Sequence, residues 1–151
     1  MTIHQTLKTS IPDALRAKDE VRLRTLRSLV TMMTNEVVAK KRKPDDFLTD
    51  EEALAVLKRA SNQRKDSIEQ FDAAGRGELS IPEKEELEVI NSFLPEQLSK
   101  EEIEVVVRAK MLELGITEKK DAGRFTGAVM QELKGRADGA DVKAVIDTLL
   151  A

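Results

Sequence analysis

The stretch Asp121-Ala-Gly-Arg-Phe-Thr-Gly-Ala-Val-Met-Gln-Glu-Leu-Lys-Gly-Arg-Ala-Asp-Gly-Ala-Asp-Val142 decides how the last third of this chain folds. Apolar residues recur three and four positions apart on both sides of Gly135, which predicts two short helices joined by a turn. The first helix is expected over about residues 119–134, with Gly135 in the left-handed conformation that commonly follows a helix. Asp138 is the expected N-cap of the second helix, whose apolar face is Val142, Val145, Ile146 and Leu149.

The same helical spacing continues toward the N-terminus through almost the whole chain. Five further helices are expected, at about residues 3–17, 19–41, 49–75, 80–94 and 99–115. No stretch alternates convincingly at the period of two residues that is typical of strands, so we predict an all-α fold. Residues 1–95 are expected to form an N-terminal bundle of about four helices, and residues 96–151 a C-terminal three-helix tail domain.

Three short motifs mark where helices are expected to begin. They are Thr49-Asp-Glu-Glu52, Ser80-Ile-Pro-Glu83 and Ser99-Lys-Glu-Glu102. Each is a capping box, in which the hydroxyl accepts a hydrogen bond from the backbone of the glutamate and the glutamate reaches back. Prolines mark interruptions. Pro12 is expected to kink or break the first helix, and Pro95 lies in a rigid linker, residues 94–99, about which the two domains are expected to move.

The composition narrows the possible chemistry. The 151 residues include no cysteine, tryptophan or tyrosine and a single histidine, His4. A nucleophile needs a neighbouring base, usually histidine or lysine, and His4 is expected at a frayed helix end. The phosphate-binding glycine loops are absent. The sequence therefore predicts no catalytic residue, no metal site and no cofactor. It also lacks a signal peptide and an apolar run long enough for a membrane span, so we expect a soluble, cytoplasmic protein with no membrane partner.

The net charge of −3 conceals a strong asymmetry along the chain. Residues 1–43 carry ten Lys or Arg and four Asp or Glu, residues 44–107 carry seven and seventeen, and residues 108–151 carry eight and seven. Two explanations are open. The basic segment attracts nucleic acid or an acidic partner, or it packs against the acidic segment within one fold.

Two basic surfaces are candidates for RNA binding. The first is the outer side of the second helix and the residues after it: Arg22, Arg24, Arg27, Lys40, Lys41, Arg42 and Lys43. The second is the turn with Lys134 and Arg136, next to a helix N-terminus that favours an anion. Asp138 and Asp141 compete with a phosphate there, so a purely structural role for the turn is the alternative.

The kind of nucleic acid follows from the aromatic residues. At least two of the four phenylalanines stand at core spacing, which disfavours stacking on single-stranded bases. Recognition of phosphates and shape remains, and it suits folded RNA. We expect no DNA partner. A further polar stretch, residues 61–66, has no large apolar side chain and is either a solvated part of the third helix or a working face with Gln63, Arg64 and Lys65.

Several segments together carry a resemblance that covers nearly the full length of the chain. They are Arg22-Leu-Arg-Thr-Leu-Arg-Ser-Leu29, Asn62-Gln-Arg-Lys-Asp-Ser-Ile-Glu-Gln-Phe71, Ala74-Gly-Arg76, Leu94-Pro-Glu-Gln-Leu-Ser99, Ala122-Gly123, Gly127-Ala-Val-Met130, Leu133-Lys-Gly-Arg-Ala-Asp-Gly139 and Val142. In these the chain resembles the GatB/YqeY family, in its YqeY branch. The resemblance implies a helical N-terminal domain followed by a tail domain that is shared with the B subunit of tRNA-dependent amidotransferases.

The resemblance also implies a function. In the amidotransferase the tail is similar to a tRNA-contacting module, while a separate large domain, for which this chain is too short, carries the catalysis. Lys143 stands where the tail of the large subunit often has asparagine, and it adds a positive charge. We therefore expect a non-catalytic accessory protein that binds tRNA or a tRNA–enzyme complex. Two alternatives are open: an adaptor that docks on an aminoacyl-tRNA synthetase or an amidotransferase, and an in-trans subunit of a carbon–nitrogen ligase with glutamine as amido-N donor.

Overall fold

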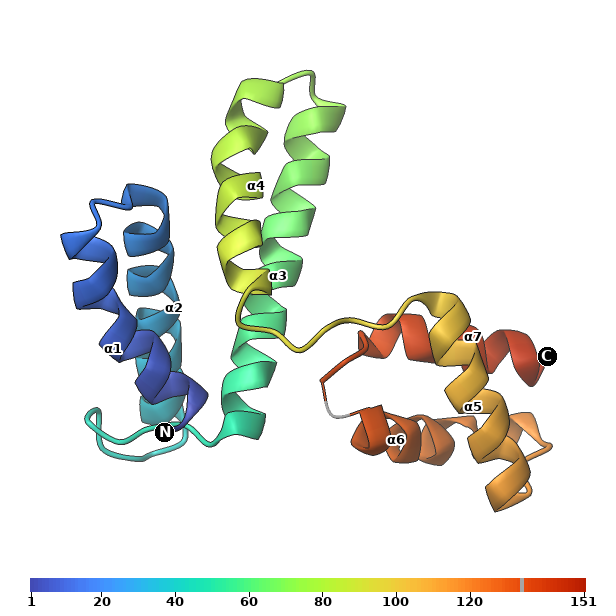
Figure 1. Cartoon of the computed structure of the whole chain (residues 1–151). Coiled ribbons are helices and arrows are strands. Elements are labelled where there is room, and N and C mark those ends of the chain that lie inside the picture. The colour runs from blue at the N-terminus through green and yellow to red at the C-terminus, as the bar shows by residue number, and fades with distance from the viewer. Residues whose placement is uncertain (134) are drawn as a thin grey trace. The chain divides into compact units, whose positions relative to one another are not determined.

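The computed structural model describes residues 1–133 and 135–151 (Figure 1). The predicted all-α fold is confirmed, since these residues contain helices and no strand. The elements are α1 (Ile3–Arg16), α2 (Glu20–Ala39), α3 (Asp50–Ala73), α4 (Gly77–Asn91), α5 (Lys100–Leu114), the 3-10 helix η1 (Lys119–Asp121), α6 (Ala122–Leu133) and α7 (Gly139–Leu149).

The contacts between residues divide the chain into two compact units, Met1–Leu94 and Pro95–Ala151. We call them the N-terminal unit and the tail unit. Each unit has its own cluster of buried apolar side chains. Burial of such side chains is the main favourable contribution to folding, at about 1.5–3 kcal/mol for each large one.

The N-terminal unit consists of two helical hairpins, α1 with α2 and α3 with α4 (Figure 1). The apolar stripe of α2 recurs every three or four residues and is fully buried at Leu26, Leu29, Met33 and Val37. Leu7 from α1 and Leu57 from α3 belong to the same core. The stripe explains why α2 is a helix although its outer face is polar, because tertiary packing of one face supplies most of the stability of a helix.

The predicted cap at Thr49 is confirmed. The Thr49 hydroxyl accepts from the backbone N–H of Glu52 at 3.2 Å, and the Glu52 carboxylate accepts from the backbone N–H of Thr49 at 2.9 Å. Ser99 is also confirmed as an N-cap, because its hydroxyl accepts from the backbone N–H of Glu102. The reciprocal half of the capping box predicted there is wrong, because the Glu102 carboxylate accepts from the Ser99 hydroxyl at 3.1 Å and not from the Ser99 backbone N–H.

The predicted cap at Ser80 is wrong. α4 begins three residues earlier, at Gly77, and the fully buried Ser80 hydroxyl donates to the Gly77 carbonyl at 2.9 Å. The turn after α3 is so short that helical hydrogen bonding resumes at once, with the Leu79 N–H donating to the Arg76 carbonyl. Pro82 therefore lies inside α4.

Of the kink or break predicted at Pro12, the break is wrong, because α1 runs without interruption from Ile3 to Arg16. A proline inside a helix leaves the carbonyl four positions earlier without its partner. Lys8 and Pro12 are both exposed, so the Lys8 carbonyl lies on the side of the helix that water reaches.

The tail unit packs α5, α6 and α7 around Ile103, Val107, Phe125, Val129 and Ile146. The helix predicted over residues 119–134 is divided, since the residues that precede α6 form the 3-10 turn η1. The left-handed conformation of Gly135 (φ 83°) and the N-cap at Asp138, whose carboxylate accepts from the backbone N–H of Ala140 at 3.0 Å, are confirmed.

The predicted linker residues make specific contacts within the tail unit. The backbone N–H of Leu98 donates to the Arg136 carbonyl at 2.7 Å, and the side-chain amide of Gln97 donates to the carbonyls of Pro95 and Gly135 at 2.8 and 2.9 Å. Residues 95–98 thus tie the start of the tail unit to the turn between its last two helices.

Candidate nucleic-acid interface

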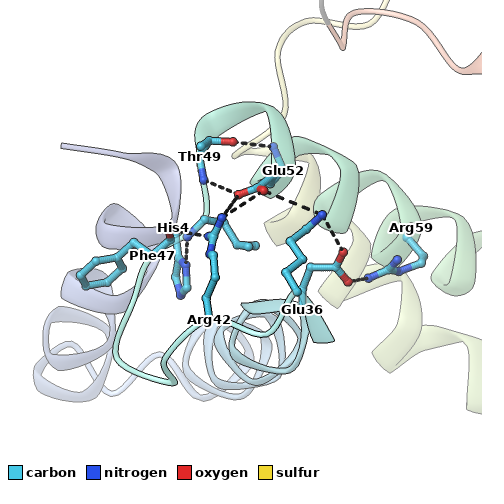
Figure 2. Close-up of polar contacts among 9 residues, drawn as sticks. His4, Glu36, Arg42, Phe47, Thr49, Glu52 and Arg59 are labelled. Atoms are coloured by element: carbon cyan, nitrogen blue, oxygen red, sulfur yellow. Dashed lines mark hydrogen bonds and ion pairs between the residues drawn. The ribbon is translucent and has the colours of Figure 1, made fainter. Parts of the chain in front are cut away.

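Glu52, in the first turn of α3, gathers two of the basic residues that were candidates for RNA binding (Figure 2). The Arg42 guanidinium donates to both Glu52 carboxylate oxygens at 3.2 Å, and the Lys40 Nζ lies 3.8 Å from Glu52 Oε1. The pKa of Glu52 is lowered, first by the hydrogen bond from the Thr49 backbone and then by Arg42 and Lys40. Glu52 is therefore held in its charged form and neutralises the basic side chains beside it.

A second carboxylate extends this cluster. Glu36 on α2 lies 3.8 Å from the Lys40 Nζ and accepts a hydrogen bond from Arg59 on α3 at 3.2 Å (Figure 2). Arg42 also donates to the Phe47 carbonyl at 2.9 Å. Lys40 and Arg42 thus fasten the end of α2 to α3, and the basic segment partly packs against acidic residues within the same unit.

His4 lies in this region too, and the prediction of a frayed helix end is wrong. His4 is 3% exposed, its Nδ1 accepts from the Leu48 backbone N–H at 2.9 Å, and its ring lies edge-on to Phe47 at 5.0 Å. Thr2 and Gln5 form a reciprocal capping box at the start of α1. The spacing Thr2-Ile-His-Gln5 was a signal in the sequence that the helix end is fixed.

Among the other candidates at the N-terminal unit, Arg24 lies 3.7 Å from Glu86 of α4, and the Arg22 guanidinium lies 5.1 Å above the ring of Phe93. Arg27, Lys41 and Lys43 differ from these. They are exposed and form no ion pair with any residue that the structure describes. The structure therefore separates the seven basic candidates into those held by partners within the fold and three that face solvent.

The predicted polar face of α3 is also divided. Arg64 points into the fold, where its Nε lies 3.6 Å from Glu83 and 3.5 Å from Glu86 of α4, and its side chain is 15% exposed. Gln63 and Lys65 are exposed. Since only Arg64 has partners inside the fold, the three residues do not form one working face.

In the tail unit, Arg136 and Lys143 are exposed and form no ion pair within residues 1–133 and 135–151. The Arg136 Nε donates to the Leu133 carbonyl at 3.3 Å, which leaves the terminal nitrogens of the guanidinium available. Asp138 already caps α7, so an anion near this helix start would be bound by side chains rather than by backbone amides. Lys134, the remaining candidate, lies outside the described residues.

Two further properties concern the described residues as a whole. No group of three or more acidic, histidine or cysteine side chains lies close enough together to hold a metal ion within residues 1–133 and 135–151. In the same part of the chain, no helix combines the length and the apolar character that crossing a bilayer requires.

Comparison with known proteins identifies a family whose model matches this chain. The family described as "Yqey-like protein" matches residues 4–150, which is almost the whole chain.

Curated relatives carry the name "Altered inheritance of mitochondria protein 41, mitochondrial". The relative from Pyrenophora tritici-repentis is 30% identical over 135 residues, which cover 87% of this chain and 71% of that protein. The relative from Candida glabrata is 38% identical over 94 residues, which cover 60% of this chain and 49% of that protein. The chain thus spans about half the length of the Candida protein. The prediction of a cytoplasmic location is contradicted, because these relatives are mitochondrial by name.

Proposed function

Because the chain belongs to the Yqey-like protein family, we propose that it is a non-catalytic accessory protein that binds folded tRNA, either alone or in a complex with an enzyme. The observation that carries the proposal is that five of the basic residues predicted to bind RNA are exposed and form no ion pair within the described residues: Arg27, Lys41, Lys43, Arg136 and Lys143. Cations of this kind exchange counterions for phosphates when RNA binds. Lys40 and Arg42 instead stabilise the N-terminal unit through Glu52.

The test is the fluorescence anisotropy of a labelled, folded tRNA titrated with the full chain at about 50 and 200 mM salt. Binding is expected to weaken steeply with salt, because each released counterion contributes to the slope. The variant Arg136→Gln with Lys143→Gln is expected to bind more weakly and with a shallower slope. Lys100→Gln with Lys119→Gln is the matched control, since it also removes two exposed positive charges from the tail unit. Absence of binding at the lower salt concentration would contradict the proposal.

One observation favours a second candidate function, that of a protein–protein adaptor. Val105 and Leu112 on α5 are 69% and 88% exposed. They lie seven residues apart on the face opposite the buried Ile103 and Val107. Exposed apolar side chains that share a helix face commonly mark a docking surface. The partner would be an aminoacyl-tRNA synthetase or an amidotransferase subunit.

The adaptor function is tested by sedimentation of the full chain mixed with purified amidotransferase. Co-sedimentation that Val105→Lys and Leu112→Lys abolish, while tRNA binding is unchanged, would support it. Unchanged co-sedimentation of both variants would contradict this use of α5.

A further inference from the structure

Two helix ends of the N-terminal unit have lysine where the backbone favours glycine. Lys18, after α1, has φ 56°, and Lys41, after α2, has φ 59°. This left-handed region places the Cβ of an L residue close to a neighbouring carbonyl, so it is usually occupied by glycine. Such outliers often mark residues that are kept for a role other than folding.

Hydrogen bonds hold both lysines in this conformation. The N–H of Lys18 donates to the Leu15 carbonyl and the next N–H donates to the Ala14 carbonyl, both at 3.1 Å. The N–H of Lys41 donates to Val38 at 2.9 Å, and the next N–H donates to Val37 at 3.2 Å. This is the Schellman motif, in which the left-handed residue closes the end of the helix.

Elsewhere in the chain the left-handed position at a helix end is filled by glycine. Gly75 has φ 71° after α3, where its N–H donates to the Asp72 carbonyl and the next N–H donates to the Phe71 carbonyl. Gly115 has φ 66° after α5. Glycine can therefore fill the left-handed position after a helix in this fold. At both ends of α2, however, this position is filled by a lysine.

A lysine near the C-terminus of a helix is favoured by the helix dipole. That contribution alone does not distinguish these ends, because α3 and α5 have no basic residue in their last turns and still end in glycine. Lys18 and Lys41 are exposed, and neither forms an ion pair with any residue in the described ranges.

The two lysines flank α2, since Lys18 stands just before its N-cap and Lys41 just after its C-cap, and the outer face of α2 lies between them along the chain. Apart from Ala39 at the end of the helix, its exposed residues recur three or four positions apart: Glu20, Arg24, Arg27, Thr31, Asn35 and Val38. After Glu20 this row contains no carboxylate, and Arg27 stands in it without an ion pair in the part of the chain that the structure describes. A helix of this length, 20 residues, spans about 30 Å. A row of cations over such a length suits a chain of phosphates better than a single small anion.

We propose that Lys18, Arg27 and Lys41 bind backbone phosphates of a folded RNA that lies along the outer face of α2. The inference rests on the proposed function and refines it. It adds Lys18 as a binding residue and assigns Arg24, Lys40 and Arg42 to the fold, where each has a carboxylate partner.

The test replaces the lysines with the residue that the backbone prefers. The full-length double variant Lys18→Gly with Lys41→Gly is expected to keep or raise the thermal midpoint, so weaker binding cannot be attributed to unfolding. Its affinity for labelled folded tRNA at about 50 mM salt is expected to fall roughly ten-fold. The slope of log affinity against log salt is expected to become shallower by about two, because two phosphates would no longer have a lysine bound to them.

Two further variants make the comparison specific. Lys18→Asn with Lys41→Asn removes the same charges with a side chain that tolerates the left-handed region, and it is expected to weaken binding equally. Lys65→Gln with Lys84→Gln removes two exposed positive charges from α3 and α4, and it is expected to leave the salt slope unchanged.

The outcomes separate this inference from the proposed function. If the unmodified chain binds tRNA and the glycine variant binds equally well with the same salt slope, the inference is overturned and the proposed function stands. If the control variant weakens binding as much as the glycine variant, the effect is one of net charge and the α2 site is overturned. If the unmodified chain does not bind tRNA at about 50 mM salt, both are overturned.

Discussion

The Nδ1 atom of His4 accepts a hydrogen bond from the backbone N–H of Leu48 at 2.9 Å, although the two residues lie 44 positions apart in the sequence. A nitrogen that accepts carries no proton, so the hydrogen bond requires a neutral ring. Burial lowers the pKa of His4, and the positive charges of Lys8 and Arg42 lower it further. This contact therefore makes the stability of the N-terminal unit sensitive to pH.

We expect the free energy of unfolding to decrease as the pH falls below the ordinary histidine pKa of about 6.5. The unfolded chain takes up the proton first, because the pKa in the folded state is lower. The decrease is expected to begin near this pH, to be no steeper than about 1.4 kcal/mol per pH unit and to end below the folded-state pKa. Urea unfolding between about pH 7.5 and 5.5 measures it.

The control for this prediction is His4→Gln, which cannot ionise. His4 is the sole histidine of the chain, and histidine is the side chain whose ordinary pKa falls in this window. The variant is expected to be less stable at neutral pH and to lose the slope. Equal slopes in the variant and the unmodified chain would show that another group is responsible.

Thr49 caps a helix, whereas Ser80 lies inside one, so replacing each with alanine is expected to have unequal effects on stability. Thr49→Ala removes a helix cap and is expected to destabilise the N-terminal unit by about 1 kcal/mol. Ser80→Ala removes a hydroxyl inside α4, where no cap depends on it, and a smaller loss is expected. Chemical unfolding of the two variants measures both, and Thr49→Ser is the conservative control. A larger loss for Ser80→Ala would argue that α4 starts at Ser80.

Two glycines of the tail unit predict effects of opposite sign. Gly127 lies inside α6 and has no atom within 4 Å of an added Cβ, so Gly127→Ala is expected to stabilise the tail unit by about 0.5–1 kcal/mol. Gly115 has equal space but φ 66°, so Gly115→Ala is expected to destabilise it by a similar amount. Thermal unfolding of both variants tests the sign, and a gain for Gly115→Ala would contradict the left-handed turn.

We propose that the two units unfold independently, because each has its own buried core. Ile146→Ala and Leu29→Ala are each expected to cost about 2–5 kcal/mol, as truncations of fully buried side chains. Native-state hydrogen exchange of the full chain locates the loss. Ile146→Ala should speed exchange only within residues 95–151, and Leu29→Ala only within residues 1–94. Equal acceleration in both ranges would show that the chain unfolds as one cooperative body.

The features that the sequence predicted correctly are local. The caps at Thr49, Ser99 and Asp138 depend on contacts within three residues, and the apolar stripe of α2 depends only on helical periodicity. The predicted N-cap at Ser80 is wrong because a serine and a glutamate three positions apart also fit the interior of a helix. α4 begins at Gly77, directly after the short turn that contains Gly75, and no side chain caps this start. A search for capping motifs therefore does not find it.

The candidate site was harder to predict, because ion pairs with residues distant in the sequence decide which basic side chains are available to bind RNA. Nothing in the run Lys40-Lys41-Arg42-Lys43 distinguishes the two cations that contact Glu52 from the two that face solvent. The distinction arises from the left-handed turn at Lys41 and from the packing of α2 on α3. The sequence allowed two explanations of the charge asymmetry, attraction of a partner and packing against the acidic segment. Only the structure shows which basic residues have acidic partners within the fold.

The hydrogen bonds between α1 and residues 48 and 50 also constrain the order in which the chain folds during synthesis. Ile3 donates its backbone N–H to the Asp50 carboxylate at 2.8 Å, and His4 accepts from Leu48. A ribosome adds about 5–20 residues per second, so Ile3 and His4 wait several seconds until their partners, more than 40 positions later in the chain, are synthesised. Until then the α1–α2 hairpin exposes the apolar faces that α3 and α4 later cover. A nascent chain arrested before residue 48 is therefore expected to be a better chaperone substrate than one that has emerged through α4.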